Sequence, residues 1–348
     1  EAGVDRLYRI PRGQSASKEI PLPLMGAASG LDGALDEDGV FFSMTGWTSP
    51  TKYYRYLPRE GSVRELGMGT HSPVDFSGIT AERVEVKSFD GTMVPLTLLR
   101  SAKLRRDRSH PTLMSGYGAY GTSITPSFSA TRLAWLEHGG ILAYAHVRGG
   151  GEKGEAWHQG GRGANKKNAV GDFIACGEYL VATGYTSPAH LAATGSSGGG
   201  PLVGGAIVKR PDLFAAAVLY NTVLNTVRYL HGTNGANQIP EMGSPETEEG
   251  YRALAAMDPT LAVREGVRYP AVLACVALND RRVSQWHSGK LVARLQASGS
   301  PAPALLRVQA EAGHGVGTTR DQAVEQLADT YSFLLWRFGD PAFAPPKP

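Results

Sequence analysis

Short apolar runs alternate with amphipathic helical segments from Arg83 to Phe338, and this alternation constrains the fold more than any other feature. Strand-length apolar runs separated by helices are typical of a mostly parallel sheet that is covered by helices. The predicted helices are Asn165–Thr183, Leu202–Lys209, Gln285–Gln296 and Thr319–Phe338. The eight predicted strands are Arg83–Phe89, Val94–Leu99, Pro111–Met114, Ile141–Val147, His190–Thr194, Phe214–Tyr220, Ala271–Leu278 and Ala304–Gln309.

The N-terminal part of the chain has a different hydrophobic pattern, with short predicted strands and no predicted helices. Leu7–Ile10, Val40–Met44 and Tyr53–Tyr56 are predicted strands between turn residues, and no helical period appears among them. So few small antiparallel strands cannot easily form a full core alone, which indicates a piece of an all-β unit. We therefore expect three parts: an all-β segment over 1–78, an α/β domain over 79–340 and a loose Pro-rich tail over 341–348.

Composition excludes several classes of protein. With 348 residues and 42% apolar side chains the chain can bury a full core, which excludes general disorder. A net charge of +3, spread along the chain, argues against binding nucleic acid or an anionic membrane, and no apolar run is long enough to span a bilayer. Cys176 and Cys275 are too isolated for a disulfide framework or a zinc site. Because the chain begins at Glu1 without a leader, we expect a cytoplasmic location, with the periplasm as the alternative.

One glycine-rich turn carries a chemical signal. A predicted strand leads into Gly195-Ser196-Ser197-Gly198-Gly199, and a predicted helix leaves it, which matches G-x-S-x-G in its strand–turn–helix context. Small residues are needed two positions either side of the serine, because larger side chains there would collide with the strand and helix. Only Ser197 has glycine at both positions; Ser196 would have Thr194 at the first. We therefore predict Ser197 as the nucleophile.

A base and an acid follow the serine in the expected chain order. A nucleophilic serine needs a base, and the base needs a carboxylate to orient it. Asp280 and His314 each come after a later predicted strand, and His314 stands between two glycines, where no core encloses it. The remaining candidate histidines, which we expect to be structural or surface residues, include His138, His158 and His190.

Together these motifs resemble the prolyl oligopeptidases, serine peptidases that combine an α/β-hydrolase domain with a β-propeller. The resemblance covers nearly all of residues 83–338 and predicts a mostly parallel eight-stranded α/β-hydrolase sheet behind a partial propeller segment. Its carriers, in chain order, are Gly116–Tyr120, Arg148–Glu152, Gly184–Pro188, Gly195–Gly200, Arg210–Phe214, Asn279–Val283 and Ala312–Gly315.

The resemblance implies a role for each matching residue. Ser197 is similar to the family's nucleophile, Asp280 to its orienting acid and His314 to its base. The backbone N–H of Gly198 and the hydroxyl of Tyr117 match the two donors of the oxyanion hole.

Three further positions match the residues that bind substrate. Arg282 matches the arginine that holds a substrate carbonyl upstream of the cleaved bond. Tyr120 and Val283 fall where the family lines its S1 pocket, although ordinary packing would also account for these two side chains. No metal or organic cofactor is implied, and the implied partners are short peptide substrates.

The sequence departs from the family in two respects. The proline-specific members stack the substrate's proline on a tryptophan, whereas the comparable stretch here, Gly235–Gly243, contains none, so strict cleavage after proline is not expected. A whole member carries a seven-bladed propeller, and residues 4–76 supply one or two blades at most. We expect a fragment of a longer enzyme in preference to a natural minimal form.

Competing interpretations remain beside the peptidase. Gly116–Gly121 also fits G-x-G-x-x-G, but no helix opens directly after it, so a dinucleotide-binding oxidoreductase is disfavoured. A non-enzymatic α/β module is disfavoured by the complete set Ser197, Asp280 and His314. The expected function is hydrolysis of peptide bonds in short peptides through an acyl-enzyme, with proline as a candidate residue before the cleaved bond. A carboxylesterase with the same three residues is the alternative.

Overall fold

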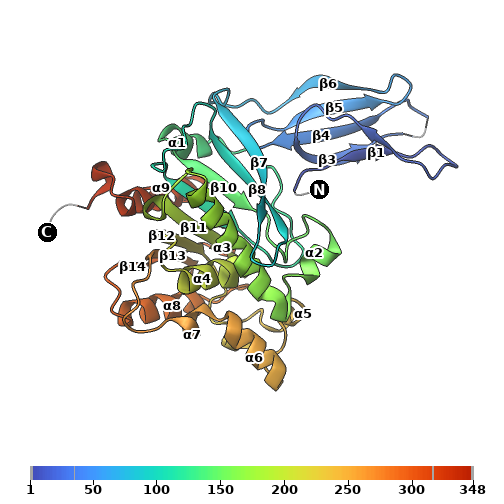
Figure 1. The fold of residues 1–348 in the computed structure, drawn as a ribbon. Helices are drawn as coiled ribbons and strands as arrows, with labels where there is room; N and C mark the ends of the chain where they lie inside the picture. Colours follow the sequence, from blue (N-terminus) through green and yellow to red (C-terminus); the bar gives the residue numbers. More distant parts are fainter. Residues whose placement is uncertain (1–2, 35, 316, 346–348) are drawn as a thin grey trace.

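The computed structural model describes residues 3–345 except 35 and 316, and it has two parts (Figure 1). A small all-β part, drawn in blue, stands beside a larger part in which helices cover a twisted sheet. This arrangement confirms the predicted fold class, a mostly parallel eight-stranded α/β-hydrolase sheet preceded by a short all-β segment.

The large sheet contains all eight predicted strands in the order β14-β13-β12-β11-β9-β10-β8-β7. Strands β9 to β14 run parallel to one another, while β8 pairs antiparallel with β7 and with β10. The β7–β8 pair is an antiparallel hairpin, with Lys87 opposite Met93 across the turn. The bounds are β7 (Ile79–Lys87), β8 (Met93–Ser101), β9 (Thr112–Gly116), β10 (Ile141–Ala145), β11 (Leu191–Ser196), β12 (Ala216–Tyr220), β13 (Ala271–Ala277) and β14 (Ala304–Gln309).

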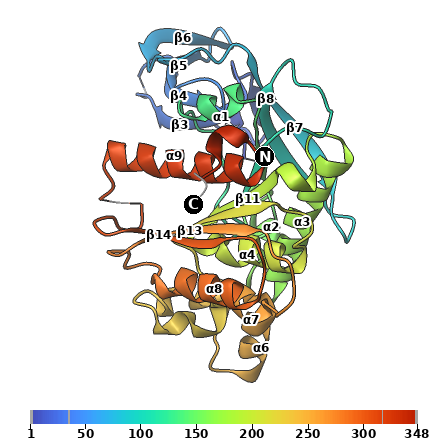
Figure 2. The same cartoon turned by 90° about the vertical axis from the view of Figure 1, so that its left-hand side faces the viewer.

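Helices cover both faces of this sheet, so its central strands are buried on both sides. Figure 2 shows α9 above the strands and α4 and α8 below them. Along β13, Val272 and Ala274 pack toward one face, and Leu273 and Cys275 pack toward the other. One face carries α3 (Lys166–Ala182), α4 (Gly200–Lys209) and α8 (Trp286–Ala297); the other carries α1 (Arg132–Glu137) and α9 (Arg320–Arg337).

A long excursion separates β12 from β13 and lies beyond one end of the sheet (Figure 1). It consists of η4 (Thr226–His231), η5 (Ala236–Gln238), α5 (Ile239–Met242), α6 (Glu248–Met257) and α7 (Pro259–Ala262). Four other short elements are α2 (Glu155–Gln159), η1 (Gly163–Asn165), η2 (Pro188–His190) and η3 (Ser197–Gly199). The longest helix of the excursion, α6, buries Leu254 and Met257.

The helix ends follow local chemistry. Gly184, with a φ of +79°, ends α3 in a Schellman motif: its N–H donates to Val181 C=O at 3.3 Å, and the Tyr185 N–H donates to Leu180 C=O at 3.0 Å. At the start of α9, Thr319 and Gln322 form a capping box. The predicted helix Asn165–Thr183 therefore agrees with α3 to within one residue at each end.

The all-β part consists of two small sheets. Its own core is small and contains Phe42, Met44 and Tyr54, whereas Trp47 and Phe76 pack against the core of the large part. Three strands were not predicted, because their polar and glycine residues show no alternation and only backbone pairing defines them. The two sheets are β1 (Leu7–Arg9) with β2 (Lys18–Ile20), and β3 (Gly26–Asp32), β4 (Val40–Gly46), β5 (Lys52–Leu57) and β6 (Ser62–Gly69).

The C-terminal tail is ordered over its first residues. Pro341–Phe343 form a 3-10 turn, η6, and the Phe343 ring packs edge-on against His138 with ring centroids 5.9 Å apart. The expectation of a loose tail is wrong for these three residues, because an aromatic side chain anchors them; residues 346–348 lie outside the described part. Within that part, every helix is too short or too polar to cross a bilayer.

His287, on α8, makes the stability of the fold depend on pH. Its ring is 2% exposed and its Nδ1 accepts the Asn225 N–H at 3.2 Å, while burial lowers its pKa from 6.5 to about 3, with Lys290 adding to the effect. Between these values the unfolded chain binds a proton that the folded chain does not, so the stability falls as the pH falls below about 6.5. By pH 5 this group removes about 2 kcal/mol from the free energy of unfolding.

Urea unfolding at pH 7 and pH 5 measures this effect. We expect His287→Gln to lose less stability between the two pH values than the unmodified protein does. An equal loss in both proteins would show that other groups are responsible.

Candidate active site

Ser197 occupies a strained turn between a strand and a helix. β11 ends at Ser196, η3 begins at Ser197, and α4 follows from Gly200. Ser197 has a φ of +51°, a left-handed conformation that is uncommon for a residue with a Cβ. The turn lifts its side chain away from the strand and places it at the start of the helical segment, as a nucleophile at such a turn requires.

Close packing explains the two flanking glycines. A Cβ on Gly195 would lie 2.7 Å from Val203 Cγ2, and a Cβ on Gly199 would lie 3.2 Å from the Gly116 carbonyl oxygen. A side chain at position 195 would therefore clash with the helix, and one at position 199 would be tight against the end of β9. Ser197 has glycine at both of these positions, whereas Ser196 would have Thr194 at the first.

Asp280 and His314 meet Ser197 at the carboxyl ends of the parallel strands. Asp280 follows β13 and His314 follows β14. His314 Nδ1 lies 2.6 Å from Asp280 Oδ2, and His314 Nε2 lies 3.0 Å from Ser197 Oγ. Three residues from three separate loops thus form one continuous hydrogen-bonded chain.

The Asp280 carboxylate is buried and rigidly held. Its side chain is fully shielded from solvent, and its Oδ1 accepts the backbone N–H groups of Arg282 at 2.8 Å and Val283 at 2.9 Å. Oδ2 is left for His314. With Oδ2 as the acceptor, the proton of the neutral imidazole belongs on Nδ1, so that Nε2 is free to accept a proton from Ser197.

Two candidate hydrogen-bond donors lie close to the serine. Gly198 is the second residue of η3, so its N–H is among the first-turn donors that have no partner inside the helix. Tyr117 lies in the loop after β9 and lines the same cavity as Ser197. Burial raises the pKa of the Tyr117 hydroxyl, and the Ser197 side chain offsets part of that rise, so the hydroxyl keeps its proton and remains a donor.

A cavity of about 410 Å³ opens beside these groups. The cavity is lined by the four side chains that the resemblance assigned to the oxyanion hole and to substrate binding, Tyr117, Tyr120, Arg282 and Val283. Val283 is buried in the wall, whereas Tyr120 and Arg282 are exposed at the opening. The complete lining is Tyr117, Tyr120, Thr122, Ser197, Val223, Asn234, Asn237, Gln238, Arg282 and Val283.

Sequence reasoning missed the amide side chains of this cavity. Asn234, Asn237 and Gln238 come from the excursion after β12, and Gln238 is 5% exposed with its Oε1 3.5 Å from the Tyr120 hydroxyl. The one signal in the sequence was the absence of a tryptophan from Gly235–Gly243. It pointed to this stretch but did not show which of its side chains would line the cavity. The wall is therefore polar where an aromatic residue was missing.

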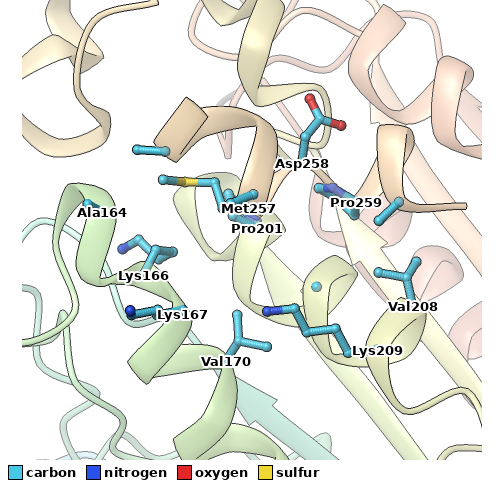
Figure 3. A pocket seen from close by; sticks show the side chains of 14 residues that line it. Ala164, Lys166, Lys167, Val170, Pro201, Val208, Lys209, Met257, Asp258 and Pro259 are labelled. Atoms are coloured by element: carbon cyan, nitrogen blue, oxygen red, sulfur yellow. The ribbon is translucent and has the colours of Figure 1, made fainter. Parts of the chain in front are cut away.

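A second, smaller cavity lies away from this site, and Ser197, Asp280 and His314 do not line it. It has a volume of about 70 Å³ and lies between α3, α4 and α7, where Figure 3 shows Lys166 and Lys167 on one side and Met257 and Pro259 opposite. Among the described residues, no three His, Cys, Asp or Glu side chains gather in a way that would hold a metal ion.

Comparison with known proteins places the chain in a family. The family model described as "Prolyl oligopeptidase family" matches residues 126–341, which is more than half of the chain. The chain belongs to the prolyl oligopeptidase family. The sequence resemblance is thereby confirmed.

Individual relatives agree with this assignment. The chain is 35% identical to a prolyl endopeptidase of Elizabethkingia meningoseptica over 340 residues, which are 97% of this chain and 48% of the relative. It is 32% identical to the dual function macrocyclase-peptidase POPB of Galerina marginata, over 96% of this chain and 47% of that protein.

Solved structures of prolyl oligopeptidases also resemble this chain closely. A structure from a study of two prolyl endopeptidases and their inter-domain dynamics superposes with a TM-score of 0.91 at 38% identity, covering 97% of this chain and 50% of the other. Prolyl oligopeptidase B of Galerina marginata, bound to a 35mer substrate, superposes with a TM-score of 0.90 at 31% identity, covering 97% and 48%. The chain therefore spans about half the length of the relatives it matches.

Proposed function

We propose that this chain is the peptidase part of a prolyl oligopeptidase and hydrolyses peptide bonds of short peptides through an acyl-enzyme. The hydrogen-bonded chain from Asp280 through His314 to Ser197, at the mouth of a 410 Å³ cavity, is the observation that carries the proposal. Membership in the family supports peptide bonds as substrates, and the names of its relatives support proline as an accepted residue before the cleaved bond.

The proposed reaction begins with attack by Ser197. As Ser197 Oγ bonds to the substrate carbonyl carbon, His314 Nε2 takes its proton, and Asp280 stabilises the imidazolium that forms. The Gly198 N–H and the Tyr117 hydroxyl hold the negative charge that develops on the carbonyl oxygen. Removal of one such donor costs about 100-fold to 1000-fold in rate.

The second half of the reaction reverses the roles. His314 gives its proton to the leaving amine, which departs and leaves an ester between the substrate and Ser197. Water then attacks this ester, and His314 takes a proton from the water. When the second tetrahedral intermediate collapses, His314 returns that proton to Ser197 and the carboxylic acid product leaves.

We also propose that residues 79–340 form the catalytic unit and that residues 1–78 are a remnant of the propeller. The start of the large sheet at Ile79 and the separate small core around Phe42 and Tyr54 support this division.

The reaction class is tested by measuring kcat/KM on a blocked Gly-Pro chromogenic amide beside a short-chain p-nitrophenyl ester. Cleavage of the amide, together with stoichiometric labelling of Ser197 by a fluorophosphonate, is the expected result. Ester turnover without any amide cleavage would contradict the peptidase proposal and favour the carboxylesterase.

Arg282→Ala tests the proposed contact with a carbonyl upstream of the cleaved bond. Because Arg282 lies at the cavity opening with its side chain exposed, it can donate a charged hydrogen bond to an extended peptide but not to a small ester. We expect kcat/KM on the Gly-Pro amide to fall about 10-fold to 100-fold, which corresponds to one charged hydrogen bond.

Hydrolysis of p-nitrophenyl acetate should change little in the same variant. Arg281→Ala is the matched control, since this neighbouring arginine is exposed and does not line the cavity. Equal losses on the amide and the acetate would contradict the assigned role of Arg282.

A further inference from the structure

A buried ion pair lies behind the candidate active site. Lys166, the first residue of α3, and Glu241, in α5, have side chains that are 1% and 4% exposed, with Nζ 3.2 Å from Oε1. Burying two charges costs several kcal/mol per ion unless the geometry and further hydrogen bonds compensate it. The hydrolytic mechanism uses neither residue, so the pair needs another explanation.

Lys166 connects this pair to the tyrosine side of the cavity. Its Nζ also donates to the Gly118 carbonyl oxygen at 2.6 Å. Gly118 lies in the loop between Tyr117 and Tyr120, both of which line the cavity. One ammonium group therefore holds the backbone that carries the oxyanion tyrosine and the tyrosine at the opening.

Glu241 connects the pair to the amide side of the cavity. Glu241 is the third residue of the short helix α5 and follows the cavity residue Gln238 by three positions. Its second oxygen, Oε2, lies 2.8 Å from His158 Nε2, and Arg162 Nε donates to the neighbouring Pro240 carbonyl at 2.5 Å. Three side chains from Trp157–Lys166 thus fix the segment that presents Gln238.

The charged and titratable groups near this pair lie on α2, α3 and α5 and in the segment between α2 and α3. Lys166 lies on α3, His158 on α2 and Glu241 on α5; Glu155 Oε1 is 3.7 Å from His158 Nδ1, and Arg162 lies between α2 and α3. Burial lowers the pKa of Lys166, and the charge of Glu241 offsets part of that fall. Burial is the main reason that the pKa of Tyr117 is raised, and the negative charge of Glu241 raises it further. Lys166, which neutralises that charge, therefore also affects a proposed oxyanion donor.

We propose that Lys166 and Glu241 are positioning residues that set the separation of the two cavity walls and thereby decide which residue is seated before the cleaved bond. The inference rests on the proposed function, because it assigns the 410 Å³ cavity to that residue of the substrate. Without the pair, the Tyr117–Tyr120 loop and the Gln238 segment lose their common anchor. A misplacement of about 1 Å can cost 100-fold in rate.

The test compares Lys166→Met, Glu241→Gln and the double variant with a matched control, Lys167→Met. Lys167 adjoins Lys166 and lies on the same helix beside the small cavity, but its side chain is exposed (Figure 3). The double variant keeps the test valid if a single charge left buried prevents folding, since replacing a buried pair by neutral groups is often tolerated.

The measured quantity is the ratio of kcat/KM for Pro to that for Gly before the cleaved bond. It is determined on blocked dipeptide amides and on benzyloxycarbonyl-Pro and benzyloxycarbonyl-Gly p-nitrophenyl esters, with p-nitrophenyl acetate as the small substrate that does not fill the cavity. We expect the ratio to fall by about tenfold or more in all three variants of the pair, the size of selectivity that one pocket contact supplies. Acetate hydrolysis also needs the tyrosine on the anchored loop but does not fill the cavity, so it should fall less than hydrolysis of the Pro substrates. Lys167→Met should match the unmodified protein.

A purely structural role would give a different pattern. Losses that are equal on all substrates and follow the fall in Tm, or a double variant with an unchanged Pro-to-Gly ratio, would overturn the inference. Failure of the proposed function is separate: amide cleavage would then be absent from the unmodified protein, while the two esters would still report the ratio.

Discussion

Replacing Ser197 with alanine should abolish hydrolysis of amides and esters alike. Ser197 Oγ is the one oxygen within hydrogen-bond distance of His314 Nε2 in the described part of the chain, at 3.0 Å. Without it no acyl-enzyme can form, and we expect kcat to fall by about 10⁵-fold or more, as in other serine hydrolases that lose the nucleophile. The assay is kcat on the Gly-Pro amide and on p-nitrophenyl acetate.

Ser196→Ala is the matched control for that variant. Ser196 is the last residue of β11, is exposed, and lies next to Ser197 in the chain. It should retain most of the activity and the fluorophosphonate labelling that Ser197→Ala loses. If Ser197→Ala kept substantial activity, or if Ser196→Ala were the inactive variant, the nucleophile would be wrongly assigned.

Asp280→Asn should give the second largest loss, about 10⁴-fold in kcat, because it reverses the histidine tautomer. Asp280 Oδ1 accepts two backbone N–H groups, so the asparagine carbonyl oxygen takes that place and its NH₂ group faces His314 Nδ1. Nδ1 must then accept, which puts the imidazole proton on Nε2. A protonated Nε2 cannot take the proton of Ser197.

The fold should survive this substitution, since the two side chains have nearly the same shape. Asp321→Asn, at an exposed position in the first turn of α9, is the control for the loss of a carboxylate in general. A fall of less than tenfold in Asp280→Asn, with an unchanged Tm, would contradict the orienting role of Asp280.

The order of the elements and the candidate triad could be predicted because both depend on local patterns. Buried parallel strands need continuous apolar runs, so β13 is legible as Ala271–Ala277 in the sequence itself. The turn at Ser197 needs glycine at two fixed positions, and Asp280 and His314 each follow a strand. Parallel strands end at the same edge of a sheet, so the three loops had to meet there.

The cavity wall could not be predicted in the same way. Asn234, Asn237 and Gln238 lie in or beside the short turn η5, and polar residues in such a turn normally face solvent. Nothing in the sequence distinguishes Gln238, which is buried in the cavity, from its exposed neighbours. Its direction depends on how the excursion folds back over the loop that carries Tyr120.

Spacing and side-chain size within a few residues are enough to predict the order of the strands along the chain, the strained serine turn and the identity of the three hydrogen-bonded residues. Which charged side chains are buried depends instead on how segments distant in the sequence pack together. Lys166 and Glu241 are 75 residues apart, and both residue types are normally exposed. They pair because two distant segments converge behind the cavity and exclude water there, a result of packing that no local pattern records.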